Sequence, residues 1–443
     1  MAVKTDDGSQ KKTKLERIGE RAKHRPDTVF NNIGHVIDLD LLRECYRELD
    51  GKKAIGIDGV TKAAYGEKLE ENLQALLARL HKRAYKPQAS RLVEIPKEDG
   101  STRPLAISCF EDKIVQLAMS KILTAVFEPE FLPCSYGYRE GMSGHEALRA
   151  LMKHSNANPD GITIEIDLRK YFNSIPHHHL MEMLEKKISD KYILRLVFRL
   201  MRSPMMVNGK AELNKIGCPQ GSIVAPVLSN IYLHHVIDSW FAKISESHLR
   251  GRAEMVRFAD DMVFVFQVKD DAERFYKVLP KRLEKYGLTL HEAKSSMIRS
   301  GSKAAAEAAR KGERLPTYKF LGFTCYWGRS RKKWFRLKYK SRSDRLAGKL
   351  KDLREYLRKS LNQKTDITVE QVKRIVRGWV NYHAISDNQG QVSAFIHWSR
   401  RALFDWINRK GGNRKMNWTK FEKLLERLNY PRSFKTVSMF TAR

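Results

Sequence analysis

Two adjacent aspartates interrupt the otherwise apolar stretch VRFADDMVFVF at residues 256–266. Apolar and aromatic residues alternate on both sides of the pair, as they do in β-strands. The pattern predicts a β-hairpin that carries Asp260 and Asp261 at its tip. Adjacent carboxylates repel each other unless a cation offsets their charge, and Mg²⁺ is a hard cation that takes oxygen ligands. Because acidic turns are common, this pair alone does not establish a metal site.

A third acid ends a second predicted strand, GITIEIDL at residues 161–168. Isoleucines alternate there with Thr163, Glu165 and Asp167, so Asp167 lies on the face opposite the isoleucines. If this strand neighbours the hairpin, the three aspartates meet. Carboxylates gathered from two strands suit a site for two metal ions that supports phosphoryl transfer.

The charge balance indicates a polyanionic partner. The chain holds 83 Lys and Arg against 51 Asp and Glu, a formal net charge of +32. Residues 327–443 carry 30 Lys and Arg but only 9 Asp and Glu, and six of the seven tryptophans lie there. Basic groups interleaved with aromatic residues suit phosphate contact and base stacking. A helical domain with a charged exterior and tryptophans in its core is the simpler alternative, and both descriptions can hold together.

Cysteine usage and the N-terminus indicate a reducing compartment, and we expect the cytoplasm. The five cysteines are scattered and never form a C-x-x-C pair, which argues against a disulfide framework and a structural zinc site. No apolar run approaches membrane-spanning length, so no membrane partner is expected. Residues 1–37 are charged and lack the apolar core of a signal peptide, and we predict a flexible basic arm.

Other segments give local predictions. RLVEIPKEDGSTRPLAI, at residues 91–107, predicts a hairpin, and the alanine-rich residues 300–313 predict an insertion or linker. Five leucines from Leu346 to Leu361 fall on one helical stripe, and Thr368 starts a capping-box pattern. The run of three histidines at residues 177–179 does not predict a metal site. Consecutive side chains cannot share one face, and a helix that begins after a proline accounts for polar residues there.

The remaining motifs occur in a characteristic order. IEIDLRKYFNSIPH, GCPQGSIVAPVLSN and RFADDMVFVF come in the order and approximate spacing of the palm motifs of reverse transcriptases, and the set most resembles the proteins encoded by bacterial group II introns, the intron maturases. VEIPKEDGSTRPLAI and SYGYREGMSGHEAL resemble their finger motifs, and LTLHEAKS their lysine-bearing motif. YKFLGF is similar to the primer grip, GWVNYH to the thumb or maturase signature, and IGIDGVT to the segment ahead of the fingers.

The resemblance implies an α+β fold arranged as a right-handed polymerase. Residues 38–160 would form an N-terminal extension and the fingers, residues 161–326 the palm, and residues 327–443 a basic helical thumb and maturase domain. The implied activity is RNA-directed DNA synthesis with two Mg²⁺ ions, for which Mn²⁺ could substitute. The implied partners are group II intron RNA, an RNA/DNA primer-template and dNTPs. The resemblance leaves the oligomeric state open.

The resemblance also implies which residues carry the chemistry. Asp167, Asp260 and Asp261 would bind the metal ions, with Leu168 as a further position of the metal site. Lys294 would donate a proton to the leaving pyrophosphate.

Other implied roles concern the nucleotide and the primer-template. Phe172 would stack under the deoxyribose and exclude a 2′ hydroxyl, although a core aromatic is the alternative. Arg139 would hold template phosphate. The remaining nucleotide contacts would be Lys97, Arg103, Gln220 and Gly221, for which a solvated hairpin face and a tight turn are the alternatives. The primer would be seated by Phe320, Leu321, Gly322 and Phe323, which could instead form a packed turn.

The sequence departs from the family at three positions. Phe258 stands where a tyrosine is usual, and Ala225 and Ser222 stand where many relatives have serine and glycine. None is a metal ligand, so we expect polymerase chemistry to survive. No Cys/His array resembles the endonuclease of longer relatives, and we expect no cleavage activity. Two rival functions remain: a host-domesticated reverse transcriptase in phage defence or DNA repair, and a maturase that only assists splicing. The complete aspartate triad counts against the second.

Overall fold

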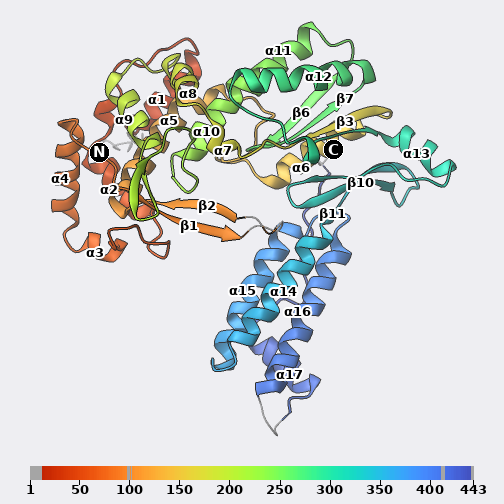
Figure 1. Ribbon diagram of the computed structural model, residues 1–443. Coiled ribbons are helices and arrows are strands. Elements are labelled where there is room, and N and C mark those ends of the chain that lie inside the picture. Colours follow the sequence, from red (N-terminus) through yellow and green to blue (C-terminus); the bar gives the residue numbers. More distant parts are fainter. Residues whose placement is uncertain (1–11, 97–99, 101, 411–414, 441–443) are drawn as a thin grey trace, which may run out of the picture.

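The computed structural model describes residues 12–96, 100, 102–410 and 415–440. The chain forms a helical N-terminal lobe, a central sheet covered by helices, and a helical bundle that projects away from both (Figure 1). This mixture of helices and strands confirms the predicted α+β class. Among the helices that the structure describes, none combines the length and the apolar composition needed to cross a membrane.

The N-terminal lobe is built around helix α5 (Phe110–Phe127), whose buried residues recur along its whole length. Its sheet has the order β2-β1-β4-β5, with β1 and β2 antiparallel, as predicted, and β1 parallel to β4. The other helices of the lobe are α1 (Lys14–His24), α2 (Leu39–Glu48), α3 (Lys62–Gly66), α4 (Leu69–His81), α8 (His177–Glu185) and α9 (Lys191–Met201). The strands are β1 (Ser90–Pro96), β2 (Thr102–Ile107), β4 (Pro204–Val207) and β5 (Lys210–Leu213). Short 3₁₀ turns are η1 (Gly34–Val36), η2 (Glu128–Glu130) and, farther along, η4 (Glu292–Lys294).

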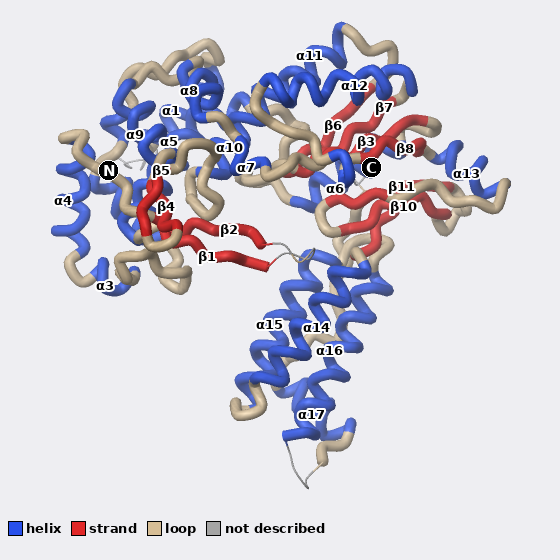
Figure 2. The backbone as a smooth tube through the Cα atoms, in the orientation of Figure 1, coloured by secondary structure: helices blue, strands red, loops and turns tan. Residues whose placement is uncertain are grey.

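The central sheet has four antiparallel strands in the order β6-β7-β3-β8 (Figure 2). Its strands are β3 (Gly161–Ile166), β6 (Ala253–Phe258), β7 (Asp261–Phe266) and β8 (Ser296–Ser300). The surrounding helices are α6 (Gly144–Asn156), α7 (Tyr171–Ser174), α10 (Ala225–Leu233), the π-helix η3 (His234–Asp238), α11 (Ser239–Ser247), α12 (Lys269–Lys285) and α13 (Ser302–Arg310).

Strand β7 is buried on both faces, which explains its unbroken apolar run. Phe264 and Phe266 point to the side of α11 and α12, where both rings contact Phe275. Val263 and Val265 point the other way and join a second core with α6 and the next sheet. Successive side chains of a strand face opposite sides, so each face receives every second residue.

A three-stranded antiparallel sheet follows and leads into the helical bundle. Its strands are β9 (Tyr318–Phe320), β10 (Phe323–Arg329) and β11 (Phe335–Ser341), in the order β11-β10-β9. The bundle consists of α14 (Ser343–Lys359), α15 (Thr365–His383), α16 (Gln389–Lys410) and α17 (Trp418–Arg427), with a core of its own. The chain then returns to the sheets, where Val437 bridges Ile385 and Met439 is buried beside α6.

The structure corrects several predictions about chain organisation. The described part of the predicted flexible arm, residues 12–37, is ordered: α1 has a Thr13 capping box and buries Ile18 in the main core. The predicted insertion at residues 300–313 is also wrong, because α13 buries Ala304 and Ala305 against the sheets. Alanine is small enough to let a helix pack closely against the sheets. The polar residues around these alanines hid this apolar face in the sequence.

The predicted domain limits also differ from the structure. A boundary at 326/327 cuts through β10, so the bundle begins only with α14. Residues 177–213, predicted as palm, return to the N-terminal lobe because β4 pairs with β1. In the bundle, Leu361 lies beyond the end of α14 and is 40% exposed. Thr368 is buried within α15 rather than capping it, since that helix begins at Thr365.

Candidate active site

The three predicted metal-binding aspartates lie together at one end of the central sheet. A two-residue turn that contains Asp260 joins β6 to β7, and Asp261 begins β7. Strand β7 also pairs with β3, where Met262 lies opposite Ile166. Asp167 follows Ile166 directly, so the antiparallel register places Asp167 across from Asp261. The predicted neighbourhood of the two strands is confirmed.

Loss of hydration and mutual repulsion disfavour the charged form of Asp260 and Asp261. Loss of hydration raises the pKa of Asp260, repulsion by Asp167 adds to the rise, and Arg103 and Arg257 oppose it. Loss of hydration, followed by repulsion from Asp260 and Asp167, raises the pKa of Asp261 to about 7. Solvent nevertheless reaches the Asp261 side chain. Carboxylates that repel one another and offer only oxygen ligands fit a divalent cation such as Mg²⁺. Among the described residues, no group of three or more His, Cys, Asp or Glu side chains is arranged so that it could hold a metal ion.

Strand β3 is held in place just beyond its end. The Asp167 amide donates a hydrogen bond to Ser295 Oγ at 3.2 Å, and the Asp167 carbonyl accepts one from the His291 amide at 2.8 Å. Leu168 forms an isolated bridge with Leu290 and buries its side chain, so only its backbone oxygen could serve as a ligand. Lys294 is exposed and immediately precedes Ser295. The predicted lysine therefore lies on the segment that anchors Asp167.

Strand β2 of the N-terminal lobe faces the aspartates. Arg103 is exposed on β2, and its positive charge partly offsets the rise in the pKa of Asp260. Tyr138, which is 58% exposed, lies near the same groups: loss of hydration raises the pKa of its hydroxyl, followed by the negative charge of Asp260. Arg103 therefore lies near the aspartates, as the prediction requires. Lys97 falls outside the described residues.

Three further predicted residues meet where β2 approaches α7. The Ala106 amide of β2 donates to the Gln220 carbonyl at 2.7 Å, and the Cys218 amide donates to the Phe172 carbonyl at 2.8 Å. Gly221 has a φ of 102° and lies so close to β2 that a Cβ would stand 2.6 Å from the Ala106 carbonyl oxygen. Phe172 is half-buried and packs against the main core. The loop that carries Gln220 and Gly221 thus connects Phe172 to the β1–β2 hairpin.

The predicted primer grip forms the β9–β10 turn. Phe320 and Phe323 are buried, while Leu321 and Gly322 have positive φ values of 48° and 80°. The Tyr382 hydroxyl of α15 donates to the Leu321 carbonyl at 2.8 Å. This contact joins the turn to the GWVNYH motif, so two sequence motifs 61 residues apart form one junction between sheet and bundle.

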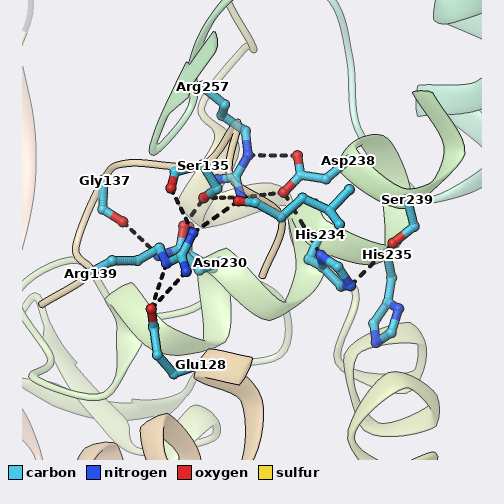
Figure 3. A network of polar contacts seen from close by, with 12 residues as sticks. Glu128, Ser135, Gly137, Arg139, Asn230, His234, His235, Asp238, Ser239 and Arg257 are labelled. Carbon is cyan, nitrogen blue, oxygen red and sulfur yellow. Dashed lines mark hydrogen bonds and ion pairs between the residues drawn. The ribbon is translucent and has the colours of Figure 1, made fainter. Parts of the chain in front are cut away.

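Arg139 does not lie where its predicted role requires. Its guanidinium donates to Glu128 at 2.8 Å and to the carbonyls of Leu132 and Ser135 at 2.9 and 2.8 Å, and only 7% of its side chain is exposed (Figure 3). Those contacts use its donors inside the protein, so the prediction that it holds template phosphate is wrong. His177, by contrast, fits the prediction of a helix start rather than a metal ligand: α8 begins there, and His177 Nε2 bonds to the Gly217 carbonyl at 2.8 Å.

Sequence patterns did not reveal several residues near the aspartates. Arg345 and Arg342 lie at the start of α14, and their positive charges partly offset the rise in the pKa of Asp261. Glu165 lies on β3 two residues before Asp167, and loss of hydration raises its pKa to about 7. Its carboxylate accepts a hydrogen bond from the Lys319 amide at 3.4 Å, which ties β3 to β9. Glu165 alternates with the isoleucines of its strand, and this pattern could have pointed to it. No sequence pattern pointed to the two arginines.

Comparison with known proteins agrees with this geometry. Residues 95–325 match the family model "Reverse transcriptase (RNA-dependent DNA polymerase)", and residues 345–424 match "Group II intron, maturase-specific domain". The chain is 26% identical to the group II intron-encoded protein LtrA of Lactococcus lactis over 68% of this chain and 47% of LtrA. It is 33% identical to Protein YkfC of Escherichia coli over 47% of this chain and 54% of YkfC. A putative COX1/OXI3 intron 1 protein of Saccharomyces cerevisiae is 28% identical over 61% of this chain and 38% of its own length.

The chain therefore spans about half the length, or less, of these relatives. The reverse transcriptase match covers more than half of the chain, contains all three aspartates and ends in β10, and the maturase match lies on the helical bundle. The chain belongs to the family of group II intron reverse transcriptases and maturases.

Proposed function

We propose that this protein copies RNA into DNA by nucleotidyl transfer at Asp167, Asp260 and Asp261. The observation that carries the proposal is the pairing of β3 with β7, whose register sets Asp167 across from Asp261 and next to the turn that contains Asp260. Bound Mg²⁺ would supply charge stabilisation and activation of the attacking hydroxyl. Mn²⁺, which accepts the same oxygen ligands, would substitute.

The surrounding residues fit supporting roles. Arg103 faces the aspartates from β2 and would contact the triphosphate of an incoming dNTP. Phe172, Gln220 and Gly221 would form the wall of the nucleotide pocket, and the β9–β10 turn would hold the primer end. Lys294 would provide a proton to the leaving pyrophosphate. The proposed contact of Lys97 with the nucleotide rests on the sequence alone.

We further propose that the partner RNA is a group II intron and that the basic C-terminal segment contributes to its binding and splicing. The support is the maturase-specific match on the bundle and the excess positive charge there. The five free cysteines suit a reducing compartment such as the bacterial cytoplasm. A host-domesticated enzyme and a splicing-only maturase are the alternatives, and polymerase activity separates the second from our proposal.

Replacing Asp260 with alanine should abolish primer extension on an RNA template, because a ligand of the proposed metal site is lost. The affinity for RNA should remain close to that of the wild type, since removing one carboxylate takes away no phosphate contact. Extension assays and RNA titration on the same preparation check both outcomes. Extension at near wild-type rate would exclude Asp260 from the chemistry.

Replacing Phe172 with alanine should admit ribonucleotides, because the smaller side chain leaves room for a 2′ hydroxyl. We expect the preference for dNTP over rNTP to fall by roughly 10- to 100-fold, as for other steric pocket changes of this size. Phe172→Tyr keeps the ring and should keep the preference. An unchanged ratio in Phe172→Ala would mean that Phe172 only fills the core.

Replacing Asp261 with asparagine should stabilise the metal-free protein at alkaline pH. The folded-state pKa of about 7 exceeds the ordinary value of 3.8, so the folded protein holds an extra proton between about pH 4 and 7. Its stability therefore falls as the pH rises through that window. Because Asp261 is exposed and solvent screens the repulsion, the variant should melt only about 1–2 °C above the wild type at pH 8, and near pH 4 the difference should vanish. Adding Mn²⁺ should raise the Tm of the wild type alone. Equal Tm values at pH 8 without metal would contradict the repulsion within the cluster.

Reversing the charge of Lys332 and Lys333 together should weaken RNA binding. Both lysines lie in the β10–β11 turn next to Trp334, which is 76% exposed. Losing two phosphate contacts should reduce the slope of log K against log salt by about 2. Lys277→Glu with Lys281→Glu on α12 makes the same charge change on another exposed surface and serves as control. Equal slopes for wild type and the turn variant would assign the turn no role in RNA binding.

A further inference from the structure

Arg257 is a charged side chain with no exposure to solvent, placed three residues before Asp260. Its guanidinium pairs with both carboxylate oxygens of Asp238, at 2.7 Å from Nε and 2.6 Å from Nη2 (Figure 3). Nη2 also donates to Ser135 Oγ at 2.7 Å. Nη1 donates to Asn230 Oδ1 at 3.0 Å and to the carbonyl oxygen of Ala259 at 3.1 Å. These five contacts match the five N–H donors of a guanidinium, so its orientation is fixed.

The partners of Arg257 come from separate parts of the chain. Asp238 ends the π-helix η3, and Asn230 lies on α10 one turn before it. The π-helix shifts the following residues around the helix axis, a feature often associated with functional sites. Ser135 belongs to the loop that continues to Arg139. The network therefore joins the loop after the fingers, the α10–α11 segment and strand β6.

One of these bonds reaches the turn that carries the aspartates. Ala259 has a φ of 56°, a left-handed conformation that is unfavourable for alanine, and it directly precedes Asp260. Its carbonyl group, which Arg257 holds, belongs to the peptide that continues into the Asp260 amide. From the opposite side, the backbone of Gly137 lies so close that a Cβ would stand 2.3 Å from the Ala259 amide nitrogen. The Asn230 amide group donates to the Gly137 carbonyl at 2.7 Å and holds that backbone in place.

We infer that Arg257, locked by Asp238, is a positioning residue that fixes the Ala259–Asp260 peptide and so presents the Asp260 carboxylate to a divalent cation. The inference rests on the proposed metal site. An ion pair buried for stability alone is the simpler explanation, but such pairs stabilise proteins little compared with apolar residues of similar volume. A role in stability alone would also not require Arg257 Nη1 to donate to the Ala259 carbonyl, next to the proposed metal ligand Asp260.

The test compares Mn²⁺ binding by wild type and Arg257→Lys, measured by electron paramagnetic resonance of free Mn²⁺. Mn²⁺ binding that persists in Asp260→Ala is assigned to other sites and subtracted. Lysine keeps the charge but cannot reproduce the planar set of five donors. We expect Mn²⁺ affinity to fall at least tenfold, as for other residues that orient metal ligands. In primer extension at fixed Mg²⁺, kcat should fall while KM for dNTP and Kd for RNA stay near wild type.

Arg139→Lys is the matched control, because Arg139 is also almost fully buried and hydrogen-bonded, but its contacts with Glu128, the Phe131 ring and two loop carbonyls lie outside the turn that carries Asp260. It should lower the Tm without changing Mn²⁺ affinity. If Arg257→Lys does the same, the inference is overturned and Arg257 is structural only.

A second variant covers the case in which Arg257→Lys does not fold. Arg257→Met combined with Asp238→Leu leaves no uncompensated buried charge, so the core should remain stable. It should still weaken Mn²⁺ binding at least tenfold, and wild-type affinity in this variant would also overturn the inference. Failure of the proposed function is a separate outcome: the wild type would bind Mn²⁺ at Asp260 but would not extend a primer.

Discussion

The pairing of β3 with β7 is the constraint on which the rest of the site depends. Its register sets Asp167 across from Asp261 and leaves Asp260 in the adjoining turn. The register cannot slip by one residue, because the alternating side chains of β7 fill two different cores. Burial of Phe264 and Phe266 on one face and of Val263 and Val265 on the other therefore holds together three carboxylates that repel one another.

Around this pairing, the β1–β2 hairpin and the start of the bundle each approach the aspartates with positive charge. Arg103 comes from β2, while Arg342 and Arg345 come from the start of α14. Behind the aspartates, Arg257 connects the turn to the loop at residues 134–139 and to the α10–α11 segment. All five N–H donors of Arg257 bond to groups within the protein, and its side chain is fully buried.

Much of the site could be predicted from local patterns. Alternation of apolar residues located β3, β6 and β7, and the acids between them marked the site. The prediction failed where tertiary contacts decide the outcome. The pairing of β4 with β1 moved residues 177–213 into the N-terminal lobe, and no local pattern encodes a parallel pairing so distant in sequence. Arg139 lies in a motif shared with the family, yet its partners, Glu128 and two carbonyls, become visible only in three dimensions. Ala304 and Ala305 seemed to belong to a linker because alanine gives no strong core signal.

In the proposed function, three aspartates from two neighbouring strands bind divalent cations for DNA synthesis. Anomalous diffraction from crystals grown with Mn²⁺, an RNA template, a DNA primer and a non-hydrolysable dNTP analogue tests it most directly. We expect two Mn²⁺ peaks about 3.5–4 Å apart, in contact with Asp167, Asp260 and Asp261. A nucleotide bound with no anomalous peak at these carboxylates, or with peaks only elsewhere, would contradict it.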